Sequence, residues 1–484
     1  MTFFCTYFHS EPFRKYTLRT LTSLLLMVAF GGATAQVLPA DPWDQARQIV
    51  AGIKEPKFKD QDFLITRFGA REGDTTLCTQ AIAAAIEACA SAGGGRVVVP
   101  KGIFYTGPIT LKSNVNLHLA DGCSLRFSTN PSDYTPFVLS RWEGLDCYNF
   151  RPLIYAYKQT NIAITGNGVL DGQADAAHWW PFALGRPGTI TQSWHPTRKA
   201  GKARLNEMAD NNIPIEQRML NEEDRLRPPF IQPYECQSIL IEGVTIIGAP
   251  FWLIHPLLSE DIIVRGVTME SHGPNNDGCD PESCRNVLIE NCHFNTGDDC
   301  IAIKSGRNND GRRWNRPSEN IVVRNCTMLD GHGGVVIGSE ISGNCRNVFA
   351  ENCTMDSKNL ERVLRIKSNS LRGGIIENVY MRNITVGACR EAIFRVEMKY
   401  EKVTEGPYLP LIRNINMENI TSKESRYGIF IDGLENAVRV EQVNVRNCRF
   451  DGVTDARGNL IIGAGNVRFS NVFLNGKEVT QNIP

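Results

Sequence analysis

One strand–turn–strand unit recurs along the second half of this 484-residue chain, and it limits the folds that the chain can adopt. Each unit has a short alternating strand, a Gly or Asn suited to a left-handed turn, and a second short strand. The turn residues are spaced by 23 to 36 residues and are Gly243, Gly266, Asn291, Asn325, Asn352, Asn383, Asn419, Asn447 and Asn471. Such a unit buries its apolar face only by stacking on its neighbours, which is typical of a solenoid.

Strand-rich coils of roughly 20–30 residues favour a parallel β-helix over a helical repeat. We therefore predict an all-β fold in which the Asn column forms a ladder along the stack. Four cysteines recur beside this column, and we expect them to pack in the core rather than to form disulfides. They are Cys292, Cys326, Cys353 and Cys448. Upstream, an Ala- and Ile-rich stretch from about Thr76 to Ala92 predicts a helix that caps the N-terminal end of the solenoid, within a capping segment of about residues 60–100.

The repeat breaks between about residues 171 and 233, in a long insertion that contains Trp179, Trp180 and Trp194. Long insertions in repeat proteins usually lie on one face, often the binding face. A decorative loop or an oligomer contact explains the insertion equally well. The sequence therefore leaves the oligomeric state open.

The N-terminus has the layout of a secretory signal peptide. Three basic residues precede a short apolar run that ends at Phe30, and small residues follow at 33–35. We predict a signal peptide over residues 1–35, a single β-helix domain over residues 36–484, and a secreted or periplasmic protein. The apolar run is too short for a comfortable membrane span.

The bulk composition argues against some classes of partner. The chain has 52 Lys and Arg against 52 Asp and Glu, so its formal net charge is zero, and 42% of its residues are hydrophobic. This balance indicates neither a nucleic-acid-binding surface nor membrane insertion, although it is compatible with a local basic site for an acidic ligand. The cysteines form no CxxC pair and no cluster with histidine, so we expect no zinc site and no cofactor.

Four consecutive coils align without gaps on a shared serine. The aligned octapeptides are NDGCDPES from Asn276, DDCIAIKS from Asp298, HGGVVIGS from His332 and ERVLRIKS from Glu361. Residues in one column of a solenoid stack about 4.8 Å apart. The alignment therefore predicts a glycine-rich groove floor around His332, with carboxylates on one side and cations on the other. The carboxylates are Asp277, Asp298 and Asp299, and the cations are Arg365 and Lys367.

The adjacent carboxylates Asp298 and Asp299 pose a packing problem at the start of a strand. Neighbours in a strand point to opposite faces, and Asp299 shares the parity of the core residues. An unpaired carboxylate in the core is costly. We therefore expect a turn near Cys300 that rotates Asp299 out of the core.

This arrangement suits acid-catalysed hydrolysis of a glycosidic bond. Like charges at close range raise the pKa of at least one carboxyl group, which keeps an acid protonated near neutral pH while the others hold a water molecule. Two functional carboxylates about 6.5–9.5 Å apart would imply inversion. The neighbouring cations favour an acidic glycan, because Arg and Lys pair with carboxylates. A calcium site is the alternative, since the strings DGCD and DD, with Asp277, Asp280, Asp298 and Asp299, offer enough oxygens for a hard cation.

The strings NNDGCD, TGDDCIAIKSG, GHGG and RIK resemble, in order and spacing, the NTD, DD, GHG and RIK motifs of polygalacturonases in glycoside hydrolase family 28. The resemblance extends from about Asp62 to the C-terminus. It implies a single catalytic domain with a right-handed parallel β-helix, which hydrolyses α-1,4-galacturonosyl bonds of pectin with inversion and without a metal. The partner would then be an acidic polysaccharide, pectin or homogalacturonan.

Transferred position by position, the resemblance assigns roles to the motif residues. Asp298 becomes the general acid, and Asp277 and Asp299 become the bases that activate water. His332 would tune the acid, and Asn275 would order the cluster.

The cations of the last motif, Arg365 and Lys367, would hold the uronate carboxylate at the cleavage point. One departure is Asn276, which stands where the family motif has Thr and leaves the acid set intact. Further substrate contacts are expected from Lys304, His255 and Arg307.

The longer string GPNNDGCDPESC…SGRNNDGRR resembles the exo-acting bacterial branch of the family, and the insertion at 171–233 would fit a wall that closes one end of the cleft. Hydrolysis of rhamnogalacturonan or xylogalacturonan is a variant of the same chemistry. Two other classes stay open. A calcium-dependent polysaccharide lyase would give unsaturated products, and a β-helical glycan-binding protein would release none.

Overall fold

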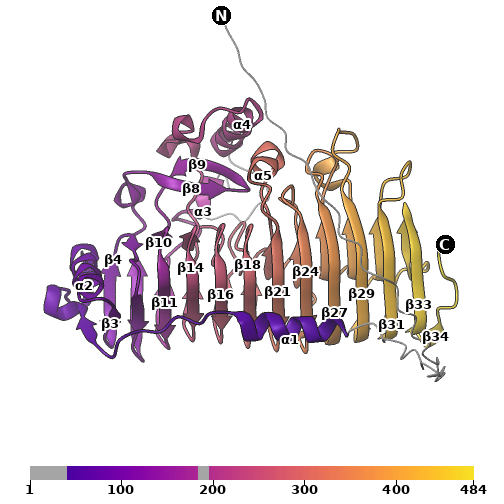
Figure 1. Cartoon of the computed structure of the whole chain (residues 1–484), viewed down its shortest axis with the longest axis horizontal. Helices are drawn as coiled ribbons and strands as arrows, with labels where there is room; N and C mark the ends of the chain where they lie inside the picture. The colour runs from indigo at the N-terminus through magenta and orange to yellow at the C-terminus, as the bar shows by residue number, and fades with distance from the viewer. Residues whose placement is uncertain (1–40, 184–195) are drawn as a thin grey trace, which may run out of the picture. The chain divides into compact units, whose positions relative to one another are not determined.

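The structure, a computed structural model, describes residues 41–183 and 196–484, and the predicted signal peptide lies outside these described residues. Residues Pro42–Pro484 form one compact unit of stacked coils (Figure 1). Strands of successive coils pair in parallel and form rows that run along the stack. The predicted all-β parallel β-helix is therefore confirmed.

Two of the rows belong to one sheet of 23 strands. The first row contains β1 (Asp62–Leu64), β3 (Gly95–Val99), β6 (Val115–Leu119), β11 (Thr160–Gly166), β14 (Gln237–Glu242), β16 (Glu260–Arg265), β18 (Arg285–Glu290), β21 (Ser318–Arg324), β24 (Cys345–Glu351), β27 (Ile375–Ala388), β29 (Leu411–Glu424), β31 (Val440–Phe450) and β33 (Ala464–Leu474). The second row contains β2 (Gly73–Leu77), β4 (Gly102–Thr106), β7 (Cys123–Phe127), β12 (Val169–Asp171), β15 (Thr245–Ile247), β17 (Thr268–Ser271), β19 (His293–Thr296), β22 (Thr327–Met328) and β25 (Thr354–Met355). The short β34 (Lys477–Glu478) pairs antiparallel with β33.

The third row carries the residues of interest for function. It contains β5 (Ile109–Thr110), β10 (Ile154–Tyr157), β13 (Ile231–Tyr234), β20 (Ile301–Ile303), β23 (Val335–Ile337), β26 (Arg362–Lys367), β28 (Ala392–Glu397), β30 (Tyr427–Asp432) and β32 (Leu460–Ile462). Isolated bridges between Ile231, Ile254, Cys279 and Ile301 join its two parts. A separate hairpin, β8 (Val138–Trp142) and β9 (Leu145–Asn149), lies outside the rows.

Helical segments cover the N-terminal end and parts of the outer faces of the coils. The α-helices are α1 (Pro42–Gly52), α2 (Thr79–Ser91), α3 (Trp180–Ala183), α4 (Pro196–Asp210) and α5 (Asn308–Trp314). The 3-10 helices are η1 (Ile65–Phe68), η2 (Pro131–Tyr134), η3 (Ile215–Gln217), η4 (Glu222–Asp224) and η5 (Tyr400–Lys402). Among the described residues, none of these helices is both long enough and apolar enough to cross a membrane.

The repeat derived from the sequence sets the register of the first row. Equivalent residues of successive units pair directly, as Ile262 does with Val287 and Val287 with Ile321. All nine predicted turn residues have φ between 51° and 78°. Gly and Asn occupy this column because they adopt the left-handed conformation at the lowest cost.

Asparagine side chains form hydrogen-bonded ladders along the stack. The predicted turn column contains such bonds, for example from Asn383 Nδ2 to Asn352 Oδ1 at 3.1 Å. A longer ladder, which the sequence analysis missed, runs through the first residue of each unit. Its members are Asn286, Asn320, Asn347, Asn378 and Asn414, with N···O distances of 2.7–3.1 Å.

A continuous apolar core runs through the coils. The four repeat cysteines pack within it, as expected, and each described cysteine is buried and unpaired. At the N-terminal end, Ile82, Ala85 and Ile86 of α2 join the same core, so the capping helix is confirmed (Figure 1). This helix begins at Thr79 rather than Thr76, because Gly73–Leu77 forms β2 and pairs with β4.

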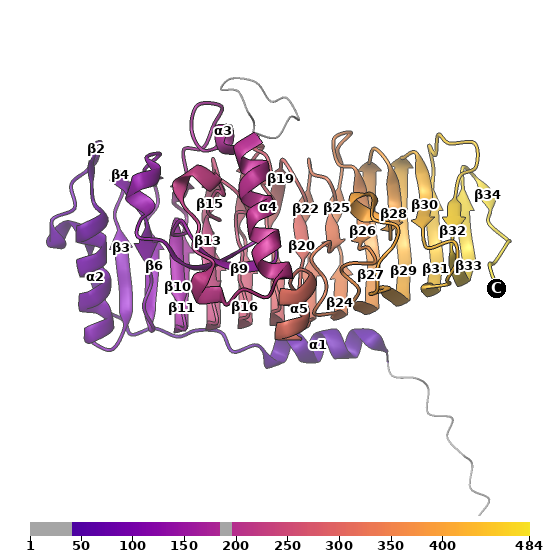
Figure 2. The same ribbon diagram turned by 90° about the horizontal axis from the view of Figure 1, so that it is seen from above.

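The insertion folds into helices and loops that pack on the third row. It contributes α3, α4, η3 and η4, and part of it, including Trp194, lies outside the described residues. A second apolar cluster joins it to the β8–β9 hairpin through Trp142, Leu205, Leu220 and Phe251. Figure 2 shows α4 lying over these coils beside α5. The insertion is therefore packed against the face that carries the site.

Replacing Asn347 with alanine should lower the free energy of unfolding by about 2 kcal/mol, because it removes two ladder hydrogen bonds and leaves a Cβ at positive φ. Asn347→Gly loses the same bonds but suits the backbone, so it should stay about 1 kcal/mol more stable than Asn347→Ala. Urea titration followed by tryptophan fluorescence measures both. Equal stabilities of the two variants would contradict the conformational role of this column.

Candidate active site

The third row brings the motif residues together in the predicted register. Ile301 pairs with Val335 and Val335 with Leu364, while a bridge joins Cys279 to Ile301. These pairs reproduce the alignment of the four octapeptides without a shift. Residues that share a column in the sequence alignment therefore lie side by side along the stack.

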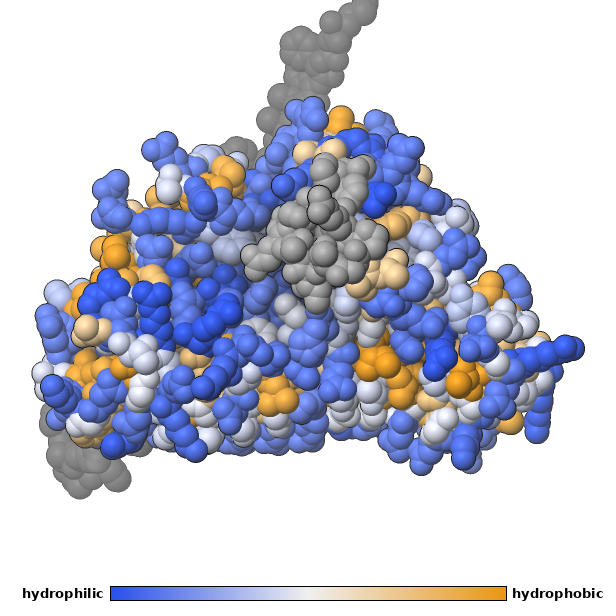
Figure 3. All heavy atoms as spheres, turned by 180° about the vertical axis from the view of Figure 1, so that it is seen from behind, coloured by the Kyte–Doolittle hydropathy of each residue, from blue (hydrophilic) through white to orange (hydrophobic). Residues whose placement is uncertain are grey.

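A pocket of about 300 Å³ opens over these columns. Seen from behind, the molecule has a recess where strongly hydrophilic side chains gather (Figure 3), in keeping with the charged lining of this pocket. Its lining residues come from the coils, the hairpin turn, α4 and η5. They are Glu143, Lys199, Lys202, Trp252, Asn275, Asp277, Asp298, Lys304, Ser339, Glu340, Lys367, Tyr400 and Glu401.

Three carboxylates meet at the floor of the pocket. Asp277, Asp298 and Asp299 each place an oxygen within 4.8 Å of the other two. This is closer than the 6.5–9.5 Å expected from the sequence, so carboxylate spacing does not by itself indicate inversion. The side chain of Asp298 is 18% exposed, whereas Asp277 is 5% and Asp299 is 0% exposed. Asp298 is therefore the member most open to a ligand.

Asp299 is turned out of the apolar core, as expected, but it stays covered. Lys367 Nζ lies 2.7 Å from its Oδ2, and Arg365 Nη1 lies 3.7 Å from its Oδ1. Two cations thus replace the water that this carboxylate has lost. Asp299 therefore already offsets part of the positive charge that we expected to bind a substrate carboxylate.

Asp280 is a fourth buried carboxylate beside the cluster. It shares the DGCD string with Asp277, but from the sequence we expected it only as a possible calcium ligand. Lys304 Nζ lies 3.4 Å from Asp280 and 3.5 Å from Asp277. Neither oxygen of Asp280 has a hydrogen-bond partner among the described residues. The charge of Lys304 is therefore shared between Asp277 and Asp280.

Burial and mutual repulsion separate the pKa values of the acids. Burial, followed by the charge of Asp280, raises the pKa of Asp277 well above its usual value. Burial also raises the pKa of Asp280 to about 8. Burial alone would raise the pKa of Asp298, but the His332 imidazolium, 2.9 Å away, and nearby lysines lower it overall. Without substrate, the cluster thus retains a proton beside an ionised Asp298.

His332 lies at the rim of the pocket, with its side chain 46% exposed. The charge of Asp298 raises the pKa of His332, in spite of partial burial. Asp298 Oδ1 also accepts a hydrogen bond from the backbone N–H of Asp299 at 3.0 Å. The imidazole and this amide together orient the carboxylate.

In the NND segment, the two asparagines have roles other than those we expected. Asn276, rather than Asn275, orders the turn that leads into Asp277. Its buried side chain accepts hydrogen bonds from Ser271 and the Gly273 N–H, and donates to two backbone carbonyls. Asn275 lines the pocket itself and accepts a hydrogen bond from Arg227 Nη2 at 2.9 Å.

His255 does not reach the pocket. Its side chain is fully buried, with Nε2 2.9 Å from Glu282 and Nδ1 3.0 Å from Gln232. Burial lowers its pKa, so the ring stays neutral and donates from Nε2. His255 shares its column with Arg365, so strand parity alone does not keep it from the pocket. The hairpin covers it instead, since Arg141 contacts the same Glu282, and His255 therefore supports the coil beneath the hairpin.

Arg307 lies beside the pocket rather than within its lining. Its side chain is 9% exposed and its guanidinium contacts Glu143, Glu340 and Glu401 at 3.4–3.8 Å. Among the expected substrate contacts, Lys304, Lys367 and Asn275 belong to the lining, whereas Arg365, Arg307 and His255 do not.

Several lining residues were missed from the sequence. Glu340 directly follows the aligned Ser339, a signal that was present in the motif alignment. Tyr400 lies with its ring 5.3 Å from Lys367 Nζ and 5.6 Å from Arg365 Cζ. Glu143 and Lys199 come from distant segments, and no local pattern marks them.

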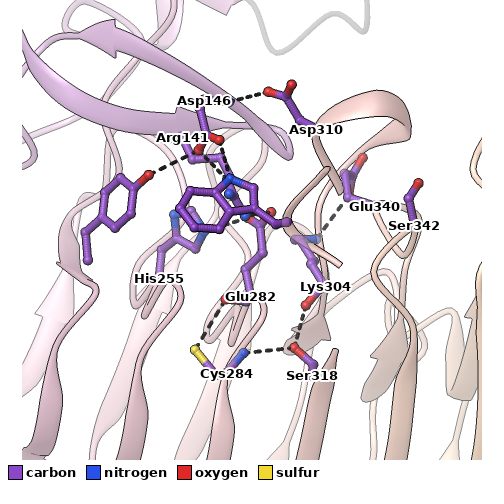
Figure 4. Close-up of polar contacts among 12 residues, drawn as sticks. Arg141, Asp146, His255, Glu282, Cys284, Lys304, Asp310, Ser318, Glu340 and Ser342 are labelled. Atoms are coloured by element: carbon purple, nitrogen blue, oxygen red, sulfur yellow. Dashed lines mark hydrogen bonds and ion pairs between the residues drawn. The ribbon is translucent and has the colours of Figure 1, made fainter. Parts of the chain in front are cut away.

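A buried charge network holds the hairpin against the coils (Figure 4). Arg141 contacts Asp146 at 2.8 Å and Glu282 at 3.1 Å, and all three side chains are fully buried. Asp310 accepts a hydrogen bond from the Asp146 N–H at 3.0 Å. Ion pairs of this kind are rigid when their hydrogen bonds are satisfied.

The hairpin turn closes on the coil at Gly144. Its carbonyl accepts a hydrogen bond from the Arg307 N–H at 3.0 Å, and φ is +83°. A Cβ at this position would lie 2.7 Å from Arg307. Only glycine fits this approach, which puts Glu143 at the wall of the pocket.

The acid cluster offers donor oxygens for a cation, but its surroundings oppose one. Each of the three carboxylates already contacts a positive group, from Lys304, His332 or Lys367. A divalent ion would meet these charges at close range. The donor set therefore fits a proton-sharing cluster better than a calcium site.

Comparisons with known proteins agree on one family. A model described as glycosyl hydrolases family 28 matches residues 215–457. The structure of a hyperthermoactive exopolygalacturonase from Thermotoga maritima is 40% identical, with a TM-score of 0.86, over 90% of this chain and 97% of that one. An exo-poly-alpha-D-galacturonosidase of Dickeya chrysanthemi is 30% identical over 66% of this chain and 54% of that protein. A probable polygalacturonase of Vitis vinifera is 28% identical over 76% of this chain and 70% of that protein.

Asp280 should make the fold less stable as the pH rises. Its pKa is about 8 when folded against 3.8 ordinarily, so its contribution to stability is complete below about pH 4 and is lost as the pH rises through 8. Asp280→Asn removes this titration. Its free energy of unfolding relative to the wild type should rise by more than about 1 kcal/mol between about pH 4 and pH 8.

Urea titrations across this pH range provide the measurement, with the exposed Asp121→Asn as the matched control. A difference between Asp280→Asn and the wild type that does not vary with pH would show that Asp280 is ionised throughout.

Proposed function

The chain belongs to the glycosyl hydrolases family 28, and on that premise we propose that it hydrolyses α-1,4-galacturonosyl bonds of pectin. The observation that carries the proposal is the carboxylate cluster at the floor of one pocket, whose member Asp299 contacts Lys367 at 2.7 Å and Arg365 at 3.7 Å. Carboxylic acids supply and remove protons, and the cations suit a uronate. A glycan-binding protein would have no use for a buried proton.

In the proposed mechanism, Asp298 is the general acid. It is the most exposed of the three carboxylates and lines the pocket, so a glycosidic oxygen can reach it. Its hydrogen bond to His332 lets the pair hold one proton. That proton passes to the leaving oxygen as the glycosidic bond breaks.

Asp277 and Asp299 act as the bases in this proposal. A water molecule between them attacks the anomeric carbon from the opposite side and gives its proton to a carboxylate. One displacement of this kind inverts the anomeric centre. Lys367 and Arg365 hold the uronate carboxylate of the sugar at the cleavage point, with Tyr400 beside them.

We further propose that the enzyme acts from one end of its substrate. The hairpin turn and α4 contribute Glu143, Lys199 and Lys202 to the pocket and leave less room for a chain that continues past them. The predicted signal peptide supports action outside the cytoplasm, with residues 36–484 as a single catalytic domain.

Product analysis on de-esterified polygalacturonate tests the proposal. Saturated galacturonic acid released as monomer, with little loss of viscosity and with chelator present, is the expected result. Asp298→Asn should lower the rate by at least about a thousandfold. Unsaturated products would assign the protein to the lyases, mixed oligomers would make it endo-acting, and no product would direct the search to rhamnogalacturonan or xylogalacturonan.

His332→Gln should move the alkaline limb of the kcat/KM profile to lower pH by about one unit or more. The pair of Asp298 and His332 keeps its proton to higher pH than a lone carboxyl group, because the charge of Asp298 raises the pKa of His332. Without the imidazole, that proton is held by the carboxyl group alone. Initial rates on digalacturonate across the pH range measure the limb, and an unchanged limb would contradict the shared proton.

A further inference from the structure

We propose that Lys199, on α4 of the insertion, binds the uronate carboxylate of the sugar at the closed end of the pocket. The inference rests on the proposed function and adds a specificity residue from outside the repeat. Through Lys199, the insertion recognises the charge of the terminal sugar in addition to limiting the length of the pocket.

The other lysines of the pocket lining each contact a carboxylate. Lys202 forms an ion pair with Glu143. Lys304 and Lys367 are engaged by the acid cluster at 2.7–3.5 Å. Lys199 is exposed and, among the described residues, has no carboxylate within 4 Å. Its ammonium group is therefore available to a second uronate carboxylate, beside the one that Lys367 and Arg365 hold at the cleavage point.

Three further carboxylates, each in contact with Arg307, share the lining with Lys199. Glu143, Glu340 and Glu401 line the same pocket, and the lysine and arginine charges around Glu340 lower its pKa to about 2 although burial opposes this. Ionised carboxylates accept hydrogen bonds from sugar hydroxyls and repel a uronate carboxylate. A galacturonate in this end of the pocket must therefore direct its hydroxyls to these acids and its carboxylate to Lys199.

Buried contacts hold both α4 and the facing hairpin in place. Leu205 and Ala209 anchor α4 in the second apolar cluster, and Arg204 forms an ion pair with Asp224. The buried network around Arg141 holds the facing hairpin (Figure 4). A cation on such a support is positioned before the substrate arrives, which favours selective binding.

The test compares two substrates with two proteins. Wild type and Lys199→Gln are assayed on digalacturonate and on digalacturonate whose non-reducing residue is methyl-esterified. Lys199→Gln should lose about tenfold or more in kcat/KM on the acid and less than about twofold on the ester. The exposed Lys423→Gln, on the C-terminal coils, is the matched control and should match the wild type on both.

Equal losses on the two substrates, or no loss on the acid, would overturn the proposal while the proposed function stands. If the wild type releases no galacturonate from either substrate, both fall together. Because Lys199 is exposed, the variant should unfold at the wild-type temperature, which a thermal melt verifies.

Discussion

The parallel hydrogen-bonded register between coils is the constraint on which the rest of this structure depends. It sets residues of neighbouring coils about 4.8 Å apart, so residues of the repeat that are 22 to 36 positions apart in sequence become direct neighbours. Left-handed Asn and Gly turns maintain the register by bending each coil at the same place. A slip of one residue would turn the side chains of Asp298 and Lys367 to the opposite face of their row. The ladders therefore support the site as well as the fold.

The acid cluster shows how charge is accommodated inside such a stack. Isolated buried carboxylates are costly, and here Lys304, Lys367 and Arg365 offset most of that cost. The compensation is incomplete, because Lys304 serves both Asp277 and Asp280. The cluster responds by retaining a proton. The strain of burying these groups and the capacity to act as an acid thus have the same electrostatic origin.

Segments outside the repeat complete the lining of the pocket. A second apolar cluster, together with the buried pairs of Arg141, holds the hairpin and the insertion over the third row. They add carboxylates and lysines to a floor that the coils already provide. Under the proposed function, the coils supply the acids and bases, and the added segments restrict which part of a polymer can reach them.

The periodicity of the chain was enough to predict the coil repeat, the left-handed turns and the columns that unite Asp277, Asp298, Asp299, His332 and Lys367. These features are local, because each coil repeats the same short pattern in a constant register. Other features emerged only from the folded chain: the burial of His255, the displacement of Arg307 from the lining, the ordering role of Asn276, and the presence of Glu143, Lys199 and Tyr400 at the pocket. Those positions depend on contacts between distant loops, whose conformations no short-range pattern specifies, because packing and ion pairing with the coils select them.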